Sequence, residues 1–448
     1  MDRSQRLREG NILELLASFS IPAIVGLLAQ ALYYVVDSIF IGRALGPVGI
    51  AGIGVCFPFT LIILAFGMLI GLGAASLISI RLGERKKTDA ELVLGNAVVL
   101  FVVASVGVTA IGLLLLDRLL LVFGADDIIL PYAHEYMQIM AIGSIFQIVG
   151  YGLNAPIRAE GNPRISMLTM LIGVLLNVIL APIFIFGLRW GMRGAALATV
   201  ISQGISAVWV VAYFLYGNSL LKIRWQNLRL KKSVCVQIMA IGLSPFALQI
   251  AASVMQSILN HQLGKYGGEE AIAAMRIIWA VVMMFFMPMF GINQGSQPIM
   301  GYNYGAGQFD RVRQALKTAV LAASAIAIFG FLTMLLAPAQ VVRLFSPEDE
   351  TLLVLGVHAM RICVIMMPTI GFQVVSAGYF LAVGKPRESM LVSLSRQVLF
   401  LIPALLILPH FFGLNGVWAS IPTADFCSAL LTGALLYMEL RHLKKRRE

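Results

Sequence analysis

The sequence predicts an all-α membrane protein with twelve transmembrane helices in two pseudo-symmetric six-helix lobes. Hydrophobic residues make up 59% of the 448 residues and charged residues only 12%, about half the share found in a soluble domain. Such a chain would expose too much apolar surface in water, so most of its surface must face lipid. The second observation is an internal repeat, because positions in the first half recur 223 residues later. Matching pairs are Pro22 and Pro245, Asp37 and Asn260, Gly161 and Gly384, Pro163 and Pro386, and Arg164 and Arg387.

Twelve stretches are apolar enough to cross a bilayer, which takes about 20 residues each. The alternating pattern of a membrane β-barrel is absent from the sequence, so all twelve are predicted to be helices. The spans lie at about 14–40, 50–79, 92–116, 132–156, 165–187, 192–216, 234–262, 270–300, 313–337, 352–382, 389–409 and 413–440.

A polar connection between the sixth and seventh spans separates the two copies. We expect an N-terminal lobe at 1–216, a cytoplasmic linker at 217–233, and a C-terminal lobe at 234–448 that ends in a basic tail. Because six is an even number of spans, both copies enter the membrane from the same side. Parallel repeats of this kind are typical of secondary transporters, whose binding site lies near the interface of the repeats.

The distribution of basic residues predicts the topology. Of the 33 Lys and Arg residues, 24 lie in the tails and the even-numbered connections, and six lie in the opposite connections. By the positive-inside rule, the chain is a multi-pass protein of the cell membrane with both termini in the cytoplasm. The net charge of +11 therefore indicates contact with membrane lipids rather than with nucleic acid. We expect a monomer, and no cleaved signal peptide, because Met1–Gly10 is charged and no cleavage site follows.

The sequence contains no pattern typical of an enzyme. It has no P-loop, no Ser/His/Asp or Cys/His arrangement at a credible spacing, and no metal-binding spacing of His or Cys. The cysteines are scattered over different spans and are expected to be small core residues: Cys56, Cys235, Cys363 and Cys427. We therefore expect neither catalysis nor a bound cofactor or metal.

Asp37 is the only acidic residue in the apolar part of the first span. A charged carboxylate at membrane depth costs about 3 kcal/mol or more, so it needs a partner or a proton. A carboxyl that gains and loses a proton there could couple ion movement to transport. The matching position of the second copy is Asn260, a neutral side chain of similar size. Packing at this place therefore does not require a carboxylate, which favours a functional role for Asp37. The alternative is a structural aspartate hydrogen-bonded to nearby Asn or Thr groups.

Further polar residues could line a binding cavity near Asp37. Gln30, Tyr33 and Asp37 lie at i, i+3 and i+7 on one stripe of the first helix. Tyr136 and Asn154 would approach the same cavity from the fourth span. Amide and phenol groups can orient a ligand without strict selectivity, although structural packing is an equal contender for each residue.

Methionine and proline residues complete the set of candidates. Met255, Met284 and Met287, in the seventh and eighth spans, could form an adaptable apolar surface, with lipid contact or core filling as the alternative. Pro22 and Pro245 are predicted to interrupt the first helix of each copy. A matched pair of broken helices indicates a cavity or a hinge.

Several charged or polar residues lie in the C-terminal spans, where such groups are functional candidates by default. Our first interpretation is nevertheless structural, with Asp425 paired to an arginine. These residues are Arg276, Arg361, Arg396, His358 and Asp425.

Four motifs together resemble the multidrug and toxic compound extrusion (MATE) family. They are Gly291–Ala306 (GINQGSQPIMGYNYGA), Ala159–Arg164 (AEGNPR) with its echo Ala382–Arg387 (AVGKPR), Gly194–Ser202 (GAALATVIS) and Asp37–Gly42 (DSIFIG). The chain is most similar to the bacterial DinF-like branch. The resemblance covers almost the whole chain and implies two six-helix lobes around a central cavity. It also implies export of amphipathic, often cationic, compounds in exchange for H⁺ or Na⁺.

In that branch, the resemblance implies a cation-coupling cluster in the N-terminal lobe. Its positions fall on Asp37 of the first span, Asn177 and Ala181 of the fifth, and Thr199 of the sixth. Three of the four match, but position 181 is alanine where the family pattern has aspartate. The cluster is therefore one carboxylate short, so either Asp37 alone carries coupling or transport is impaired.

The expected function is secondary active efflux of amphipathic compounds in exchange for H⁺ or Na⁺, by alternating access. One alternative is a flippase for lipid-linked precursors from the same superfamily, which predicts a cationic cavity. Another is a non-transporting channel or scaffold protein. The absence of an arginine cluster from the N-terminal spans counts against the flippase.

Overall fold

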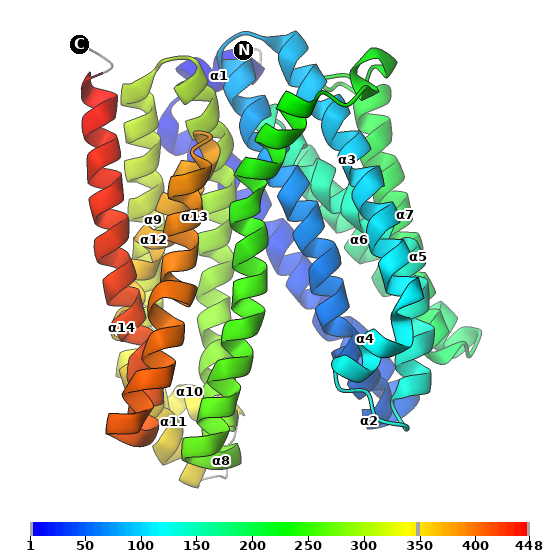
Figure 1. Cartoon of the computed structure of the whole chain (residues 1–448), viewed down its shortest axis with the longest axis vertical. Coiled ribbons are helices and arrows are strands. Elements are labelled where there is room, and N and C mark those ends of the chain that lie inside the picture. Colours follow the sequence, from blue (N-terminus) through cyan, green and yellow to red (C-terminus); the bar gives the residue numbers. More distant parts are fainter. Residues whose placement is uncertain (1–2, 346–349, 446–448) are drawn as a thin grey trace. The chain divides into compact units, whose positions relative to one another are not determined.

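The computed structural model describes residues 3–345 and 350–445, and this part of the chain is helical and without strands. Figure 1 follows the order of the elements from blue to red. They are α1 (Arg3–Glu9), α2 (Ile12–Gly83), α3 (Lys87–Leu114), α4 (Leu116–Val122), α5 (Leu130–Ala159), α6 (Pro163–Pro182), η1 (Ile183–Gly187), α7 (Gly191–Leu215), η2 (Trp225–Leu228), α8 (Lys232–Gly305), α9 (Phe309–Leu336), α10 (Pro338–Phe345), α11 (Glu350–Cys363), α12 (Met367–Ala382), α13 (Pro386–Leu394), η3 (Ser395–Leu401) and α14 (Ile402–Lys445).

The twelve predicted spans are confirmed, although several are joined into longer helices. Among the described residues, eight helical segments are long and apolar enough to cross a membrane, and the pair α11–α12, bent by 51°, forms a ninth. Three of the eight turn at a glycine with non-helical backbone angles, namely Gly46 in α2, Gly268 in α8 and Gly413 in α14. Each of the three holds two spans. For example, the 72 residues of α2 would measure about 108 Å as one helix, against a hydrocarbon core of about 30 Å.

Equivalent glycines of the two copies have the same backbone conformation. Gly46 has φ 68° and ψ −157°, and Gly268 has φ 66° and ψ −159°. Gly161 and Gly384 also share a positive φ, at 92° and 70°. Residues other than glycine essentially do not adopt the conformation of Gly46 and Gly268, so the turn between the first two spans of each copy depends on glycine.

The chain packs into two compact units. Unit 1 comprises Met1–Arg8 and Val25–Phe246, and unit 2 comprises Glu9–Ile24 and Ala247–Glu448. The beginning of α2 thus packs in unit 2 and the beginning of α8 packs in unit 1, and the crossing points occupy matching places in the two copies. These units follow packing, whereas the lobes 1–216 and 234–448 follow the repeat, so the linker boundary at 217–233 stays a prediction.

Pro22 and Pro245 lie just before these crossing points, but neither breaks its helix. The only non-helical residues inside α2 and α8 are Gly46 and Gly268, so the predicted interruption at the prolines is wrong for this conformation. A proline inside a membrane helix is tolerated where neighbouring helices support it. The helix α8 packs closely at this place, because Gly295 lies against the backbone of Ser20, two residues before Pro22. A hinge at the prolines stays a prediction.

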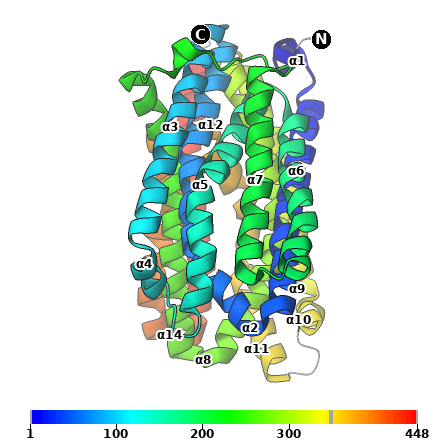
Figure 2. The same ribbon diagram turned by 90° about the vertical axis from the view of Figure 1, so that its right-hand side faces the viewer.

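Within unit 1, the helices α5, α6 and α7 pack against one another, and α3 packs against α5. Figure 2 shows α5, α6 and α7 standing side by side. Small residues allow the close approach: Gly71 of α2 lies against the backbone of Gly152 of α5. These helices surround the cavity described next.

Candidate functional site

Unit 1 contains a cavity between α2, α5, α6 and α7. It encloses about 720 Å³, including some open space, which falls within the range of small-molecule sites. Its described lining contains aromatic rings, amides and hydroxyls, and none of these lining residues carries a charge. They are Gln30, Tyr33, Tyr34, Phe146, Gln147, Gly150, Tyr151, Asn154, Thr169, Met170, Gly173, Val174, Asn177, Thr199, Ser202, Gln203 and Ser206.

Thr199 connects three of the helices at this cavity. The Asn177 Nδ2 atom donates a hydrogen bond to Thr199 Oγ1 at 3.1 Å, which links α6 to α7. The Tyr33 hydroxyl lies 3.2 Å from the same oxygen, which adds α2. Two members of the predicted coupling cluster and one predicted substrate-binding residue therefore lie in direct contact.

Asp37 lies one helical turn beyond Tyr33 and is only 6% exposed. Its Oδ1 atom is buried and has no hydrogen-bond partner in the described part of the chain, and Asp37 forms no ion pair there. It does not line the cavity, but its carboxyl interacts electrostatically with the hydroxyls of Tyr33 and Tyr136. An unpaired carboxylate in such a place is costly, and a proton removes that cost.

Ala181 is fully buried on α6, one turn beyond Asn177. Both residues lie on the buried stripe of this helix, so position 181 faces the interior of unit 1. A methyl group supplies no oxygen ligand. Directly after it, Pro182 ends α6 and the chain continues as the π-helical turn η1.

The predicted substrate-binding residues separate into two groups. Gln30, Tyr33 and Asn154 line the cavity of unit 1. The amide of Asn154 is already occupied, because it donates to the Ser166 carbonyl at 2.7 Å and accepts from the Ser166 hydroxyl at 2.6 Å. Asn154 therefore stabilises the cavity wall, and only part of its polar surface is left for a ligand.

The other candidates do not line this cavity. Tyr136 is buried outside it, near Asp37. Met255, Met284 and Met287 belong to unit 2, where Met255 is buried and Met284 is 67% exposed. A role of these four residues in substrate binding stays a prediction.

Sequence reasoning missed two glutamines in the cavity, Gln147 of α5 and Gln203 of α7. Their Oε1 atoms are buried and have no hydrogen-bond partner among the described residues. The signal was present, because Gln147, Tyr151 and Asn154 lie at i, i+4 and i+7. Polar residues at this spacing inside an apolar span form one stripe of a helix.

Unit 2 contains a smaller cavity of about 380 Å³, lined mainly by apolar residues. At its edge Arg396 Nε donates to Asp425 Oδ1 at 2.5 Å, which confirms that Asp425 pairs with an arginine. Arg276 and Arg361 lie on exposed positions. The His358 Nε2 atom lies 2.9 Å from Asn415 Oδ1.

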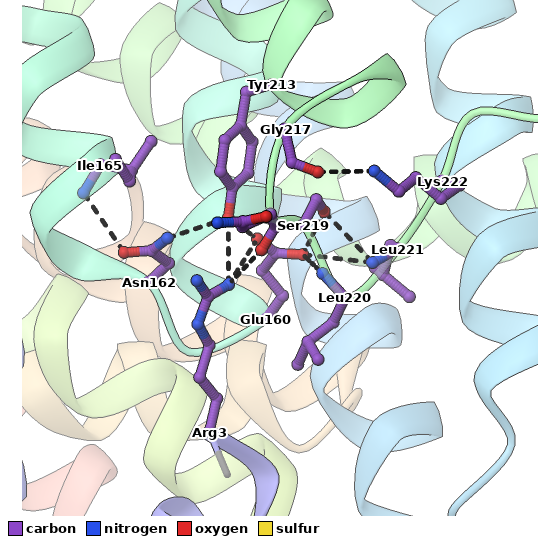
Figure 3. A network of polar contacts seen from close by, with 11 residues as sticks. Arg3, Glu160, Asn162, Ile165, Tyr213, Gly217, Ser219, Leu220, Leu221 and Lys222 are labelled. Carbon is purple, nitrogen blue, oxygen red and sulfur yellow. Dashed lines mark hydrogen bonds and ion pairs between the residues drawn. The ribbon is translucent and has the colours of Figure 1, made fainter.

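A second buried carboxyl, Glu160, lies at the end of α5 and was also missed (Figure 3). It accepts hydrogen bonds from the hydroxyls of Tyr213 and Ser219, the latter at 2.5 Å. Its Oε2 atom also accepts from the backbone N–H of Leu220 at 3.0 Å, and Arg3 Nη1 lies 3.6 Å from Oε1. Burial raises the pKa of Glu160, although its hydrogen bonds and Arg3 oppose this effect. The carboxyl thereby fixes the start of the α7–α8 connection.

The described residues contain no cluster of three or more His, Cys, Asp or Glu side chains that could hold a metal ion. Paired copies of six spans, with a polar cavity inside unit 1, have the architecture of a membrane transporter built from parallel repeats.

Comparison with known proteins identifies the family. The family model described as MatE matches twice, at residues 22–183 and 245–406, and the two matches are offset by the same 223 residues as the sequence repeat. The chain therefore belongs to the MATE family of multidrug efflux transporters, and it is not an enzyme.

Individual relatives agree over almost the whole length. The multidrug export protein MepA of Staphylococcus haemolyticus (strain JCSC1435) is 28% identical over 429 residues, covering 96% of this chain and 94% of the relative. The solved structure of the MATE multidrug transporter DinF-BH in complex with R6G is 41% identical, covers 95% of both chains and has a TM-score of 0.88. An outward-facing MATE transporter of the MOP superfamily is 25% identical, covers 99% of both chains and has a TM-score of 0.92. These similarities confirm the resemblance, the DinF-like branch and the two-lobe helical fold.

Proposed function

We propose that this transporter exports amphipathic, often cationic, drug-like compounds in exchange for H⁺, with Asp37 as the coupling group. The observation that carries the proposal is the state of Asp37, which is 6% exposed and has no ion pair in residues 3–345 and 350–445. A carboxyl without a compensating cation can be neutralised by a proton and charged again when the proton leaves. Repeated neutralisation and ionisation are what an exchange mechanism requires.

The cavity of unit 1 has the chemistry of a site for organic cations. Tyr33, Tyr34 and Tyr151 present electron-rich rings, and aromatic faces attract cations. The unpartnered amide oxygens of Gln147 and Gln203 can accept hydrogen bonds from a ligand. DinF-BH, which is 41% identical, was solved in complex with R6G, and this supports a drug-like ligand for the present chain.

Tyr33 connects the coupling group to the cavity. It lies one turn from Asp37, interacts with that carboxyl electrostatically, and contacts Thr199 at the cavity wall. Ionised Asp37 attracts a cationic ligand and protonated Asp37 does not, so a proton taken up from outside releases the substrate there. A proton that moves inward down 100 mV in exchange for a neutral substrate contributes about 2.3 kcal/mol, enough for about a fifty-fold gradient of that substrate. Exchange of one proton for a monovalent cation moves no net charge, so the pH gradient alone drives export of such a substrate.

The site fits H⁺ better than Na⁺ as the coupling ion. A sodium ion needs several oxygen ligands around it. Asn177 and Thr199 bind each other rather than Asp37, and Ala181 lacks an oxygen altogether. Protonation of Asp37 requires no further ligand.

The proposal places the chain as a monomer in the cell membrane, in contact with lipids, with both termini in the cytoplasm. The excess of Lys and Arg in the tails and the even-numbered connections supports this orientation. The flippase alternative predicts a cationic cavity, and the neutral lining in unit 1 counts against it.

The test measures substrate efflux from proteoliposomes under separate pH and Na⁺ gradients, with wild type and Asp37→Asn. We expect a pH gradient to drive efflux by the wild type, and Asp37→Asn to release substrate only at the rate of protein-free liposomes. The matched control is Asn260→Ala, which changes the repeat counterpart and should retain gradient-driven efflux. Gradient-driven efflux by Asp37→Asn at the wild-type rate would refute the coupling role, and absence of any transport by wild type would favour the channel or scaffold alternative.

Ala181→Asp tests the missing carboxylate. We expect this variant to exchange two protons instead of one per substrate, because the second carboxyl would face the same interior as Asp37. The ratio is measured as the proton flux divided by the substrate flux at a fixed pH gradient. An unchanged ratio in a folded variant would mean that position 181 has no access to the coupling ion.

A further inference from the structure

The connection between α7 and α8 is fixed on the side of α3. Arg224 Nε lies 2.9 Å from Glu91 Oε2, and Glu91 is almost fully buried on α3. Asn96, five residues further along α3, donates to the Asn227 carbonyl at 3.3 Å and accepts from the Lys231 backbone N–H at 2.7 Å. The short helix η2 is therefore held at both of its ends by buried side chains.

The fit between η2 and α3 also depends on Gly95. A Cβ atom at this position would lie 2.5 Å from the carbonyl oxygen of Asn227, closer than real Cβ contacts occur. Only a glycine allows η2 to approach α3 so closely. The connection is thus a packed segment in a defined place, and Figure 1 shows it as the green loop beside the start of α3.

With the α7–α8 connection packed on α3, the opposite face of the connection is exposed. We call it the linker face and define it by Trp225, Arg229, Leu230, Lys231 and Lys232. Trp225 is 88% exposed and Leu230 is 51% exposed, and the three basic residues are exposed as well. The sequence from Gly217 to Ser233 contains no acidic residue, so this face has a positive charge around an exposed indole.

The position of the linker face along α3 corresponds to the membrane interface. Arg224 pairs with Glu91, which is four residues, or about 6 Å, from the start of α3 at Lys87. The headgroup region of a bilayer is also about 6 Å thick on each side of the hydrocarbon core. Further along α3, Val102 and Val103 are exposed and apolar, as expected for a surface in lipid. Tryptophan is enriched at this depth, because its ring is apolar and its N–H is polar.

We propose that the linker face is a binding site for anionic phospholipid headgroups of the cytoplasmic leaflet. The indole of Trp225 and the side chain of Leu230 lie in the interface, and Arg229, Lys231 and Lys232 bind the phosphates. The positive charge selects anionic lipid over zwitterionic lipid. We choose the membrane rather than an acidic protein as the occupant, because the linker is docked on α3, and the same helix exposes the apolar side chains of Val102 and Val103 further along its length. Neither the substrate cavity nor Asp37 is involved.

The experiment measures quenching of Trp225 fluorescence in nanodiscs that contain the full-length chain. The signal of this residue is the difference between wild type and Trp225→Phe, which removes one of the five tryptophans and keeps an apolar ring. A small, equal fraction of either phosphatidylglycerol or phosphatidylcholine with brominated acyl chains is added to a phosphatidylcholine bilayer. We expect phosphatidylglycerol to quench the Trp225 signal at a markedly lower fraction than phosphatidylcholine.

A charge-neutralised variant tests the basic residues. Arg229→Gln, Lys231→Gln and Lys232→Gln are combined, and docking on α3 is retained because Asn96 binds the backbone of Lys231 rather than its side chain. We expect the preference for phosphatidylglycerol to fall by about five-fold for each removed charge. The matched control removes three exposed charges from the face predicted to be extracytoplasmic, with the changes Arg118→Gln, Arg189→Gln and Arg343→Gln.

The outcomes separate the possible ligands. A preference that is lost in the linker variant and kept in the control supports the site. Equal quenching by the two lipids, or an equal loss of preference in the control, overturns it. Inorganic phosphate at millimolar concentration should leave the quenching unchanged, whereas displacement of the brominated lipid would mean that the site binds free phosphate instead.

Discussion

Asp37 and Glu160 are both buried carboxyls of unit 1, but their surroundings are opposite. Glu160 accepts hydrogen bonds from two hydroxyls and from backbone N–H groups, and Arg3 lies nearby. Asp37 has none of these partners in the described part of the chain. Hydrogen-bond donors hold a carboxyl in one structural role, whereas a carboxyl without them is free to exchange a proton. Of the two, Glu160 is therefore the structural group.

The pKa of Glu160 gives a pH-dependent prediction at the scale of one residue. Burial raises this pKa in the folded state, so the folded protein resists ionisation more than the unfolded chain does. The contribution of Glu160 to stability is therefore complete below the unfolded pKa, near 4.5, and is lost as pH rises through the folded pKa. Glu160→Gln does not titrate, so its melting temperature should rise relative to wild type over this pH window and then level off.

Melting curves of both proteins between pH 4 and pH 8 would measure this difference. The control is Glu269→Gln, at an exposed position, whose difference from wild type should not vary with pH. A Glu160→Gln difference that falls with rising pH would mean that the hydrogen bonds and Arg3 outweigh burial.

A carboxyl in an apolar span is conspicuous in a sequence, and this made Asp37 a candidate, whereas Asn177 and Thr199 became candidates only through the resemblance to the MATE family. Their partners were not predictable, because a contact depends on how each helix is rotated about its axis. The bond between Asn177 and Thr199 is an example, since the two residues lie on different helices. The same limit explains why Glu160 was missed, because its donors come from α7 and from a connection of no regular pattern.

At the scale of an element, the π-helix η3 places Arg396 against Asp425. A π-helical turn inserts one residue into a helix and occurs frequently at functional or strained places. Arg396 is 22% exposed and Asp425 only 1%, so the pair is shielded from water. The second carboxylate oxygen of Asp425 has no partner among the described residues, so this pair depends on a single contact.

A double-mutant cycle should reveal how far the two charges depend on each other. Arg396→Met alone leaves an uncompensated buried carboxylate and should lower the free energy of unfolding by about 3–5 kcal/mol. The double variant Arg396→Met/Asp425→Leu should recover most of this loss, because no charge is left without a partner. Denaturant unfolding in detergent would measure both, and equal losses in the single and double variants would contradict a coupled pair.

The positions of the spans followed from composition, but the positions of the breaks did not. Proline was expected to interrupt α2 and α8, yet glycines at the turns between spans do so instead. Proline removes only one hydrogen bond, which neighbouring helices can compensate. The 51° bend between α11 and α12, by contrast, does coincide with a proline, because Pro368 lies in the first turn of α12 and disfavours a helix that runs straight through it.

At the scale of the whole molecule, the repeat predicts that the same substitution at matching positions of the two copies changes the free energy of unfolding by the same amount. An added Cβ at Gly46 or Gly268 would meet no atom within 4 Å, so alanine there costs only backbone strain. Gly46→Ala and Gly268→Ala should each lower the free energy of unfolding by about 1–3 kcal/mol. The control is Gly54→Ala, inside a helix with equally open space, which should be neutral or stabilising. Clearly unequal losses at Gly46 and Gly268 would mean that the two turns differ in more than backbone angles.

Two copies of six spans could be predicted from the sequence, because a fixed offset of 223 residues relates many positions. The exchange of helix beginnings between the units could not, since an apolar pattern predicts that a helix is buried but not which unit buries it. That exchange has a consequence for how the protein is made. Glu9–Ile24 leaves the ribosome early, but the rest of unit 2 begins only at Ala247. At about 5–20 residues per second, this first segment waits for roughly 10–45 s in the membrane before synthesis of the rest of its unit begins.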